Sequence, residues 1–346
     1  MKNKKTYYRY DSADYAALSK SDIPAALADT AGMRFDSAED ASVFFARELD
    51  YIKSQSYDVE YPELTALSIF PISSEVDPGA ETITYYSYDK TGIAKLISNY
   101  ATDLPRADVK GKPTTASIKS IGDSYGYSIQ EMRASRMAGK SLDVRKGESA
   151  RYQIDRLNNQ IAWAGDEETG LVGVLSSAND IPLYTLPIGV NGSISWGDKT
   201  PTEIMADING MQKQVAAATK NVERPDTLVL PSDVYIDIST RQIENTGYTV
   251  KRFIEENAPY LKDIIPASEL QSDSPETNPY GASDGTGQNV ALLFKNDARK
   301  LTIENPMPFY QYPVQPKGLE VVIPCEARTA GAIIYYPLSL LIAVGV

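Results

Sequence analysis

The stretch SIQEMRASRMAGKSLDVRKGESARYQIDRLNNQIAWAG, residues 128–165, holds two helical patterns in tandem. The first begins with a capping box, in which the Ser128 hydroxyl and the Glu131 carboxylate lie three residues apart. The second begins near Ser141 and ends at Gly165, the expected C-cap. At 1.5 Å per residue it would be about 37 Å long. We therefore expect a long helix, the spine helix, that lies across a sheet or along a partner.

The spine helix should bury a single stripe, because its apolar residues recur at spacings of three and four. These residues are Ala150, Ile154, Leu157, Ile161 and Ala164. Its polar side is expected to hold Arg145, Lys146, Arg151, Asp155, Arg156 and Asn158. A helix with only one apolar stripe is not the buried centre of a bundle.

The composition allows a large core without cross-links. The chain has 346 residues, 42% of them hydrophobic, and one cysteine, Cys325, for which we expect a buried thiol. No disulfide can form within the chain. Because there is no histidine, Ser-His-Asp and Cys-His catalysis and most zinc enzymes are excluded.

The net charge of −12 argues against a sequence-reading DNA binder. The first nine residues are nevertheless basic, which predicts a solvated tail or an arm that touches phosphate or an acidic partner. They show no signal peptide, so we expect a soluble protein made in the cytoplasm. The apolar residues 331–346 are too short to span a membrane and should form buried β-structure.

The first third of the chain predicts an arm followed by a projecting hairpin. Residues 1–35 are polar, and residues 37–56 form an amphipathic pattern. Residues 80–89 alternate as a strand, Lys110–Pro113 is a predicted turn, and residues 114–129 are a second β-rich run. Such a hairpin has little core of its own and needs something to lie on.

The remainder predicts an α/β unit and then β-structure. Helices are expected at 200–218, 232–239 and 250–257, and strands at 226–230, 261–265 and 289–294, with a polar loop at 271–288. Strands at 301–305, 319–325 and 332–346 should pair with the sheet beneath the spine helix.

No group of residues in the sequence has the types and spacing of a catalytic or ligand-binding site, so we predict no catalytic, cofactor-binding or metal-binding residue. Residues 134–141 resemble a phosphate loop but follow a helix, so Gly139 is expected to join two helices. The glycines of 281–287 indicate a mobile loop. Asp166, Glu167 and Glu168 are expected to be solvated, with an intersubunit contact or carboxylate catalysis as alternatives. The sequon at Asn191 has no role without secretion.

The order of these parts resembles the major capsid protein of tailed bacteriophages, the Hong Kong phage-type fold that encapsulins share. The local sequence is similar to one branch of that group over roughly residues 40–346. The similar stretches are Glu48–Ile52, Pro78–Tyr85, Gly126–Glu131, Ala164–Gly165 and Thr169–Leu171.

The resemblance implies an α+β fold of four parts. Residues 1–72 would be the N-terminal arm and 73–127 the extended β-loop. Residues 128–174 and 299–346 would be the peripheral domain with the spine helix, and 175–298 the α/β axial domain. No motif matches the covalent cross-linking of the founding member, so that chemistry is not carried over.

The resemblance also implies self-assembly into pentamers and hexamers of an icosahedral phage head around double-stranded DNA. Expected partners are copies of the chain, with scaffold, portal and decoration proteins, weak non-specific contact with DNA, and no membrane. The protein would lie in the virion capsid after assembly in the host cytoplasm. The alternatives are an encapsulin-like compartment and a hydrolase that uses paired carboxylates.

Overall fold

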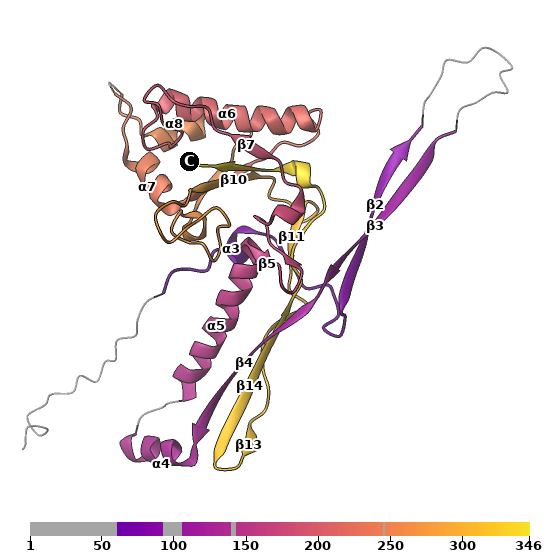
Figure 1. Cartoon of the computed structure of the whole chain (residues 1–346), viewed down its shortest axis with the longest axis vertical. Helices are drawn as coiled ribbons and strands as arrows, with labels where there is room; N and C mark the ends of the chain where they lie inside the picture. Colours follow the sequence, from indigo (N-terminus) through magenta and orange to yellow (C-terminus); the bar gives the residue numbers. More distant parts are fainter. Residues whose placement is uncertain (1–60, 93–105, 140–142, 245) are drawn as a thin grey trace, which may run out of the picture. The chain divides into compact units, whose positions relative to one another are not determined.

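The spine helix is helix α5, Asp143–Trp163, in a computed structural model that describes residues 61–92, 106–139, 143–244 and 246–346 (Figure 1). Its 21 residues correspond to about 31 Å. The predicted helix was longer, and its predicted start at Ser141 lies outside the described residues. Ala150, Ile154 and Ile161 are buried against a sheet, as the stripe predicts.

Two residues of α5 contradict the single-stripe prediction. Leu157, placed in the stripe, is 42% exposed, whereas Asn158, placed on the polar side, is only 5% exposed. The reason is that α5 packs on two surfaces in succession. Its middle lies on strands, but its last turn, with Ala162 and Trp163, enters a second core shared with helix α3, Ala66–Ile69. The buried face therefore widens toward the end of the helix.

The sheet beneath α5 has four strands. Strand β4, Lys119–Ser128, pairs over its whole length with β14, Glu320–Thr329. Strands β12, Met307–Gln311, and β13, Gln315–Lys317, also pair with β14. Helix α4, Ile129–Ala138, follows β4 directly. Its capping box is confirmed, and Gly139, which was expected to join two helices, caps the C-terminus of α4 with a φ of 65°.

A second sheet lies at the end of α5, in the order β1-β11-β15-β6-β5. Its strands are Ile72–Ser73, Leu301–Glu304, Gly331–Ile334, Leu171–Val172 and Gly165–Asp166. Gly165 has a φ of 80° and lies in β5, where the chain turns back after the helix.

The α/β unit is a third sheet, in the order β7-β16-β10-β8-β9. Its strands are Leu183–Thr185, Leu340–Val344, Val290–Phe294, Thr227–Pro231 and Asp263–Ala267. Its helices are α6, Pro201–Ala218, α7, Ser232–Thr240, and α8, Val250–Asn257, with short 3-10 turns η2, Ser177–Asn179, η3, Ser268–Leu270, and η4, Pro337–Ser339.

Of the strands predicted to pair beneath the spine helix, only 319–325, within β14, does so; β11 and β15 lie in the second sheet and β16 in the third, so the prediction is wrong for these three. Strand β16 lies between β7 and β10 with alternate residues facing two cores. Leu341 and Ala343 face the core that includes α6, α7 and α8, and Leu340 and Ile342 face the core shared with β11 and β15. A strand buried on both faces reads as continuously apolar, so its sequence gives no sign of which sheet it joins.

The predicted hairpin is present, but its second strand was misplaced. Strand β2, Thr82–Thr91, pairs with β3, Asp108–Ser117, and residues Lys110–Pro113 are strand rather than turn. A two-stranded ribbon has free edges, and these tolerate Gly111 and Pro113. The predicted 37–56 helix and the basic N-terminus lie outside the described residues.

Candidate assembly surfaces

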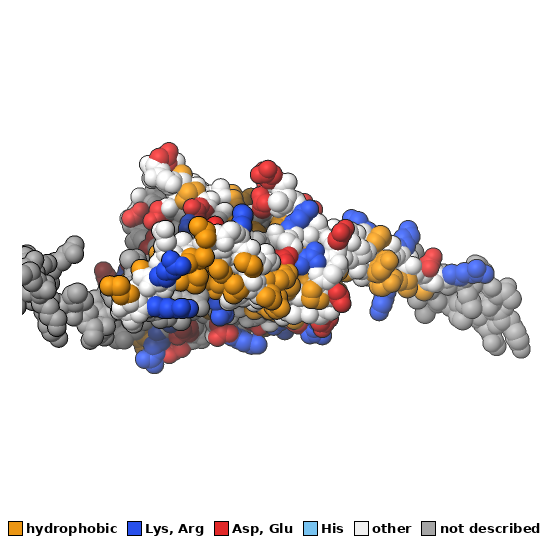
Figure 2. Space-filling model, turned by 90° about the horizontal axis from the view of Figure 1, so that it is seen from below, with side chains coloured by type: hydrophobic (Ala, Val, Ile, Leu, Met, Phe, Trp, Pro, Cys, Tyr) orange, Lys and Arg blue, Asp and Glu red, His pale blue; other side chains and the backbone are white. Residues whose placement is uncertain are grey.

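The β2–β3 hairpin has two chemically different faces, because paired residues on antiparallel strands point to the same side. One face carries Tyr86 and Tyr88, opposite Pro113 and Gly111, followed by the pair Lys90 and Val109. The two tyrosine rings stack with centroids 6.4 Å apart. Tyr86 is 62% and Tyr88 70% exposed, and hydrophobic side chains gather on the hairpin in Figure 2. We call this side the aromatic face.

The other face of the hairpin is polar, with Ser87 opposite Lys112 and Asp89 opposite Lys110. The described hairpin residues from 82 to 92 and from 106 to 117 hold four basic and two acidic side chains. The hairpin is therefore locally positive, whereas the whole chain carries −12. Such an element is attracted to acidic surfaces, including those of another copy.

The base of the hairpin is fixed to the rest of the chain. The rings of Tyr85 and Tyr335 meet edge to face with centroids 4.9 Å apart. The backbone N–H of Ile118 donates to Glu81 (2.8 Å), and Arg328 donates to the Pro78 carbonyl. Beyond this base the strands are almost entirely exposed, with no other described element beside them (Figure 1).

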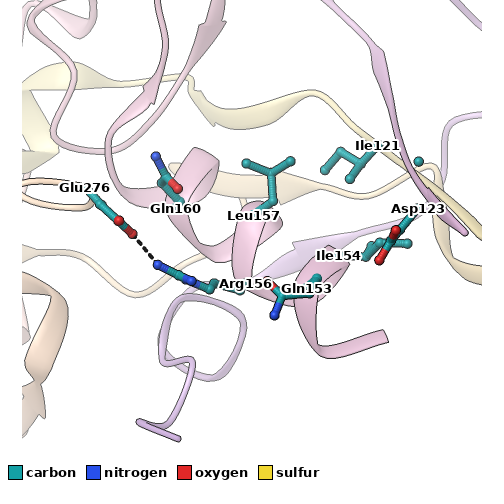
Figure 3. A pocket seen from close by; sticks show the side chains of 9 residues that line it. Ile121, Asp123, Gln153, Ile154, Arg156, Leu157, Gln160 and Glu276 are labelled. Carbon is teal, nitrogen blue, oxygen red and sulfur yellow. Dashed lines mark hydrogen bonds and ion pairs between the residues drawn. The ribbon is translucent and has the colours of Figure 1, made fainter. Parts of the chain in front are cut away.

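A groove of about 500 Å³ runs between α5 and β4 (Figure 3). Its apolar part is formed by Ile121, Ile154 and the exposed Leu157. Arg156 and Glu276, paired at 2.7 Å, lie at one end, and the hydrogen bond and charge of Glu276 raise the pKa of Arg156. The polar lining also includes Asp123, Gln153 and Gln160.

A second depression of about 370 Å³ continues this groove along α5, sharing Leu157 and Gln160 with it and reaching Asp166. Together they form an open channel with an apolar floor and a polar rim, which suits an extended segment better than a small molecule. We call the two depressions the α5 groove.

The stretches considered in the sequence as possible reactive or binding sites do not come together in one site. Asp166 accepts hydrogen bonds from the Thr169 hydroxyl (2.6 Å) and the Glu168 N–H (3.3 Å), while Glu167 and Glu168 are exposed, as expected for a solvated turn. Residues 134–139 are helical or cap a helix, so they form no phosphate loop.

The glycines of 281–287 do lie in a loop. The base of that loop is held by Asn278, a fully buried residue whose side-chain amide contacts the carbonyls of Leu270, Gln271 and Gln288 at 2.9–3.2 Å. Sequence reasoning missed Asn278, because one asparagine among many loop residues gives no signal.

Cys325 is buried beneath α5, and burial raises the pKa of its thiol. Within the described residues there is no group of three or more His, Cys, Asp or Glu side chains that could hold a metal ion. None of the described helices is both long enough and apolar enough to cross a membrane. The features that the structure brings together are surfaces rather than reactive groups.

An extended hairpin, a spine helix over a long-stranded sheet and an α/β unit together define the fold of tailed-phage capsid proteins. Solved structures support this assignment of the fold. The capsid of Myoviridae phage XM1 is similar with a TM-score of 0.72 at 15% identity, over 88% of this chain and 100% of that one. An empty GTA particle capsid is similar with a TM-score of 0.60 at 9% identity, over 90% and 99%. A structure from Mycobacterium phage Adephagia is similar with a TM-score of 0.57 at 15% identity, over 83% of this chain and 90% of that one.

The family model described as major capsid protein matches residues 92–346, which is most of the chain. The chain therefore belongs to the major capsid protein family, and its role is that of a capsid shell protein. The predicted α+β capsid fold is confirmed. A search of curated proteins returns no significant match.

Proposed function

We propose that copies of this chain assemble into the pentamers and hexamers of an icosahedral head that encloses double-stranded DNA. The observation that carries the proposal is the β2–β3 hairpin, a ribbon with an exposed aromatic face. Two strands alone are marginally stable in water, and aromatic side chains are enriched in protein interfaces. The hairpin therefore needs a second surface to cover its aromatic face.

That surface is another copy of the chain. The α5 groove is apolar at Leu157, and its lining holds three carboxylates, Asp123, Asp166 and Glu276, against two basic side chains, Lys119 and Arg156. A locally positive ribbon with an aromatic face complements both features. Because the hairpin of one copy reaches the next copy, the contacts propagate, and many weak contacts give a strong shell.

The parts of the chain have distinct roles in this proposal. Residues 1–72 act as the arm, 73–127 as the extended loop, 128–174 with 299–346 as the peripheral domain, and 175–298 as the axial domain. Scaffold, portal and decoration proteins complete the particle, which assembles in the host cytoplasm. DNA is held only by weak contact, since a chain with a net charge of −12 repels it, and the chain has no enzymatic activity of its own.

The first test is electron microscopy of the purified chain after size-exclusion chromatography. Closed shells, tubes or rings of five or six copies are expected. DNA inside native particles would support a phage head, whereas enclosed protein cargo would favour an encapsulin-like compartment. A chain that stays monomeric at high concentration, even with candidate scaffold protein, would contradict the proposal.

The aromatic face gives a sharper test. The double variant Tyr86→Ser, Tyr88→Ser should fold normally, because neither ring is part of a core, but should lose at least about tenfold in assembled particles. Ser87→Ala, on the polar face of the same strand, is the matched control and should assemble. Equal particle yields from both variants would remove the hairpin from the proposal.

A further inference from the structure

The segment 186–200, which connects β7 to α6, is a long loop held in one conformation by buried charges. The Asp207 carboxylate accepts hydrogen bonds from Lys199 Nζ (2.6 Å) and from Trp196 Nε1 (3.0 Å). All three side chains are buried. A buried ion pair contributes little net stability, but breaking it is costly, so it fixes the position of the loop. Long loops of this kind are usually either disordered or functional, and the buried charges hold this one in place.

A second set of hydrogen bonds fixes the tip of the same loop. The Glu203 carboxylate accepts from the N–H groups of Val190 and Thr200, both at 2.8 Å. Asn191 donates to the Asp198 carbonyl (2.6 Å), and Arg241 donates to the carbonyls of Trp196 and Gly197. The tip, residues 187–192, is therefore ordered before it meets any partner, which lowers the entropic cost of binding.

This ordered tip presents aliphatic side chains to solvent. Ile188 is 72% exposed and Val190 is 87% exposed. Moreover, no residue from 181 to 197 carries a charge, although the chain as a whole carries −12. A rigid, uncharged, aliphatic tip on an acidic protein is an arrangement suited to an interface.

We propose that the tip at residues 187–192 packs against the same tip of other copies of this chain. The inference rests on the proposed self-assembly and names one of its contacts. When identical segments converge, every charge in them meets its own copy, and like charges repel. An uncharged tip avoids that repulsion, whereas a tip that met a different, acidic surface of the neighbour would gain from carrying basic residues. Gly192 adds no side chain to the tip, and nothing lies within 4 Å of where its Cβ would be, so another copy can approach closely there.

The test places a single charge on the tip. Ile188→Asp and Ile188→Lys, purified separately, should keep the thermal stability of the unmodified chain, because the side chain is exposed. Each variant should form at least about tenfold fewer rings or shells, since its charge is repeated around the contact. Val222→Asp, at an exposed aliphatic residue after α6, is the matched control and should assemble normally.

Mixing the two Ile188 variants identifies the partner. If the tip meets itself, opposite charges become neighbours, and the mixture should assemble better than either variant alone. A mixture that stays defective would mean that the tip contacts another surface, and would overturn the inference. Normal assembly of Ile188→Asp alone would also overturn it, leaving the proposed function intact. Failure of the unmodified chain to assemble would instead overturn the proposed function, and this contact with it.

Discussion

At the scale of single residues, Asp226 joins three strand ends of the α/β sheet. Its carboxylate accepts hydrogen bonds from Lys295 Nζ (2.7 Å) and from the N–H of Asn296 (3.0 Å), and Lys262 Nζ lies at 3.4 Å. Burial alone would raise the pKa of Asp226, but the hydrogen bonds to Lys295 and Asn296 outweigh it and lower that pKa below its usual value. The ionised carboxylate therefore stabilises the fold.

Asp226→Asn should lower the free energy of unfolding by about 1–3 kcal/mol at neutral pH, because it weakens charge-assisted hydrogen bonds. The pKa is lower in the folded state than in the unfolded state, whose value is about 3.9. The contribution is thus complete above that pH and is lost as pH falls through the folded pKa. Thermal melts followed by circular dichroism from pH 7 to pH 3 should show the difference between the two proteins shrinking in acid. A constant difference would contradict this account.

Single residues also show why part of the fold could not be predicted from sequence. Asn158 and Asn159 are both buried, because they form hydrogen bonds to Asn305 and Glu269, more than 100 residues away. Lys199 and Asp207 look like ordinary surface charges in the sequence. Helical periodicity records which residues are apolar, but a buried polar residue depends on a distant partner that periodicity does not show.

At the scale of elements, a tight reversal follows α5. A Cβ on Gly173 would lie 2.2 Å from the backbone nitrogen of Gly165 and 2.6 Å from the Trp163 carbonyl oxygen. The chain there doubles back on the end of the helix, and Leu175 donates to that same carbonyl at 2.7 Å. Only glycine fits between two backbones this close.

Gly173→Ala should therefore lower the free energy of unfolding by at least about 2 kcal/mol, since neither backbone can yield cheaply. Urea unfolding measures the change. Gly247→Ala is the matched control, because a Cβ at Gly247 meets nothing within 4 Å. The prediction is wrong if the two variants unfold at the same urea concentration.

Most helices and strands could be predicted where several local features of the sequence, such as a capping box and a proline at the helix start, indicate the same element. The start of α6 combines a capping box at Thr200 and Glu203 with Pro201, and the helix predicted at 200–218 is present. The β2–β3 ribbon was harder, because Gly111 and Pro113 are turn residues in most contexts. Its aromatic face follows from the strand register. That register could not be predicted, because the second strand was placed at 114–129, whereas β3 is Asp108–Ser117.

At the scale of the whole described unit, Glu269 joins three segments distant in sequence. Its carboxylate accepts hydrogen bonds from the N–H and hydroxyl of Thr65, both at 2.8 Å, and from Asn159 of α5 at 2.9 Å. Asn159 in turn accepts from the N–H of Ala66 (2.9 Å). Glu269 lies in η3. Its hydrogen bonds therefore connect the start of α3 and the spine helix to the α/β unit.

Glu269→Ala should lower the free energy of unfolding by about 2–3 kcal/mol, because the half-buried donors of Thr65 and the buried amide of Asn159 lose their acceptor. Glu276→Ala is the control: this residue forms an exposed ion pair with Arg156 and should cost about 0–1 kcal/mol. Denaturant unfolding of both variants gives the comparison. Equal effects would mean that the network does not hold the segments together.

The single cysteine of the chain has a practical consequence for chemical labelling. The Cys325 thiol is buried and its pKa is raised, so thiol-directed reagents should leave the folded protein unmodified. A cysteine introduced at Lys112, on the polar face of the hairpin, would then be the one reactive thiol in each copy. Fluorophores attached there would report, by energy transfer between copies, when and how closely hairpins gather as particles form.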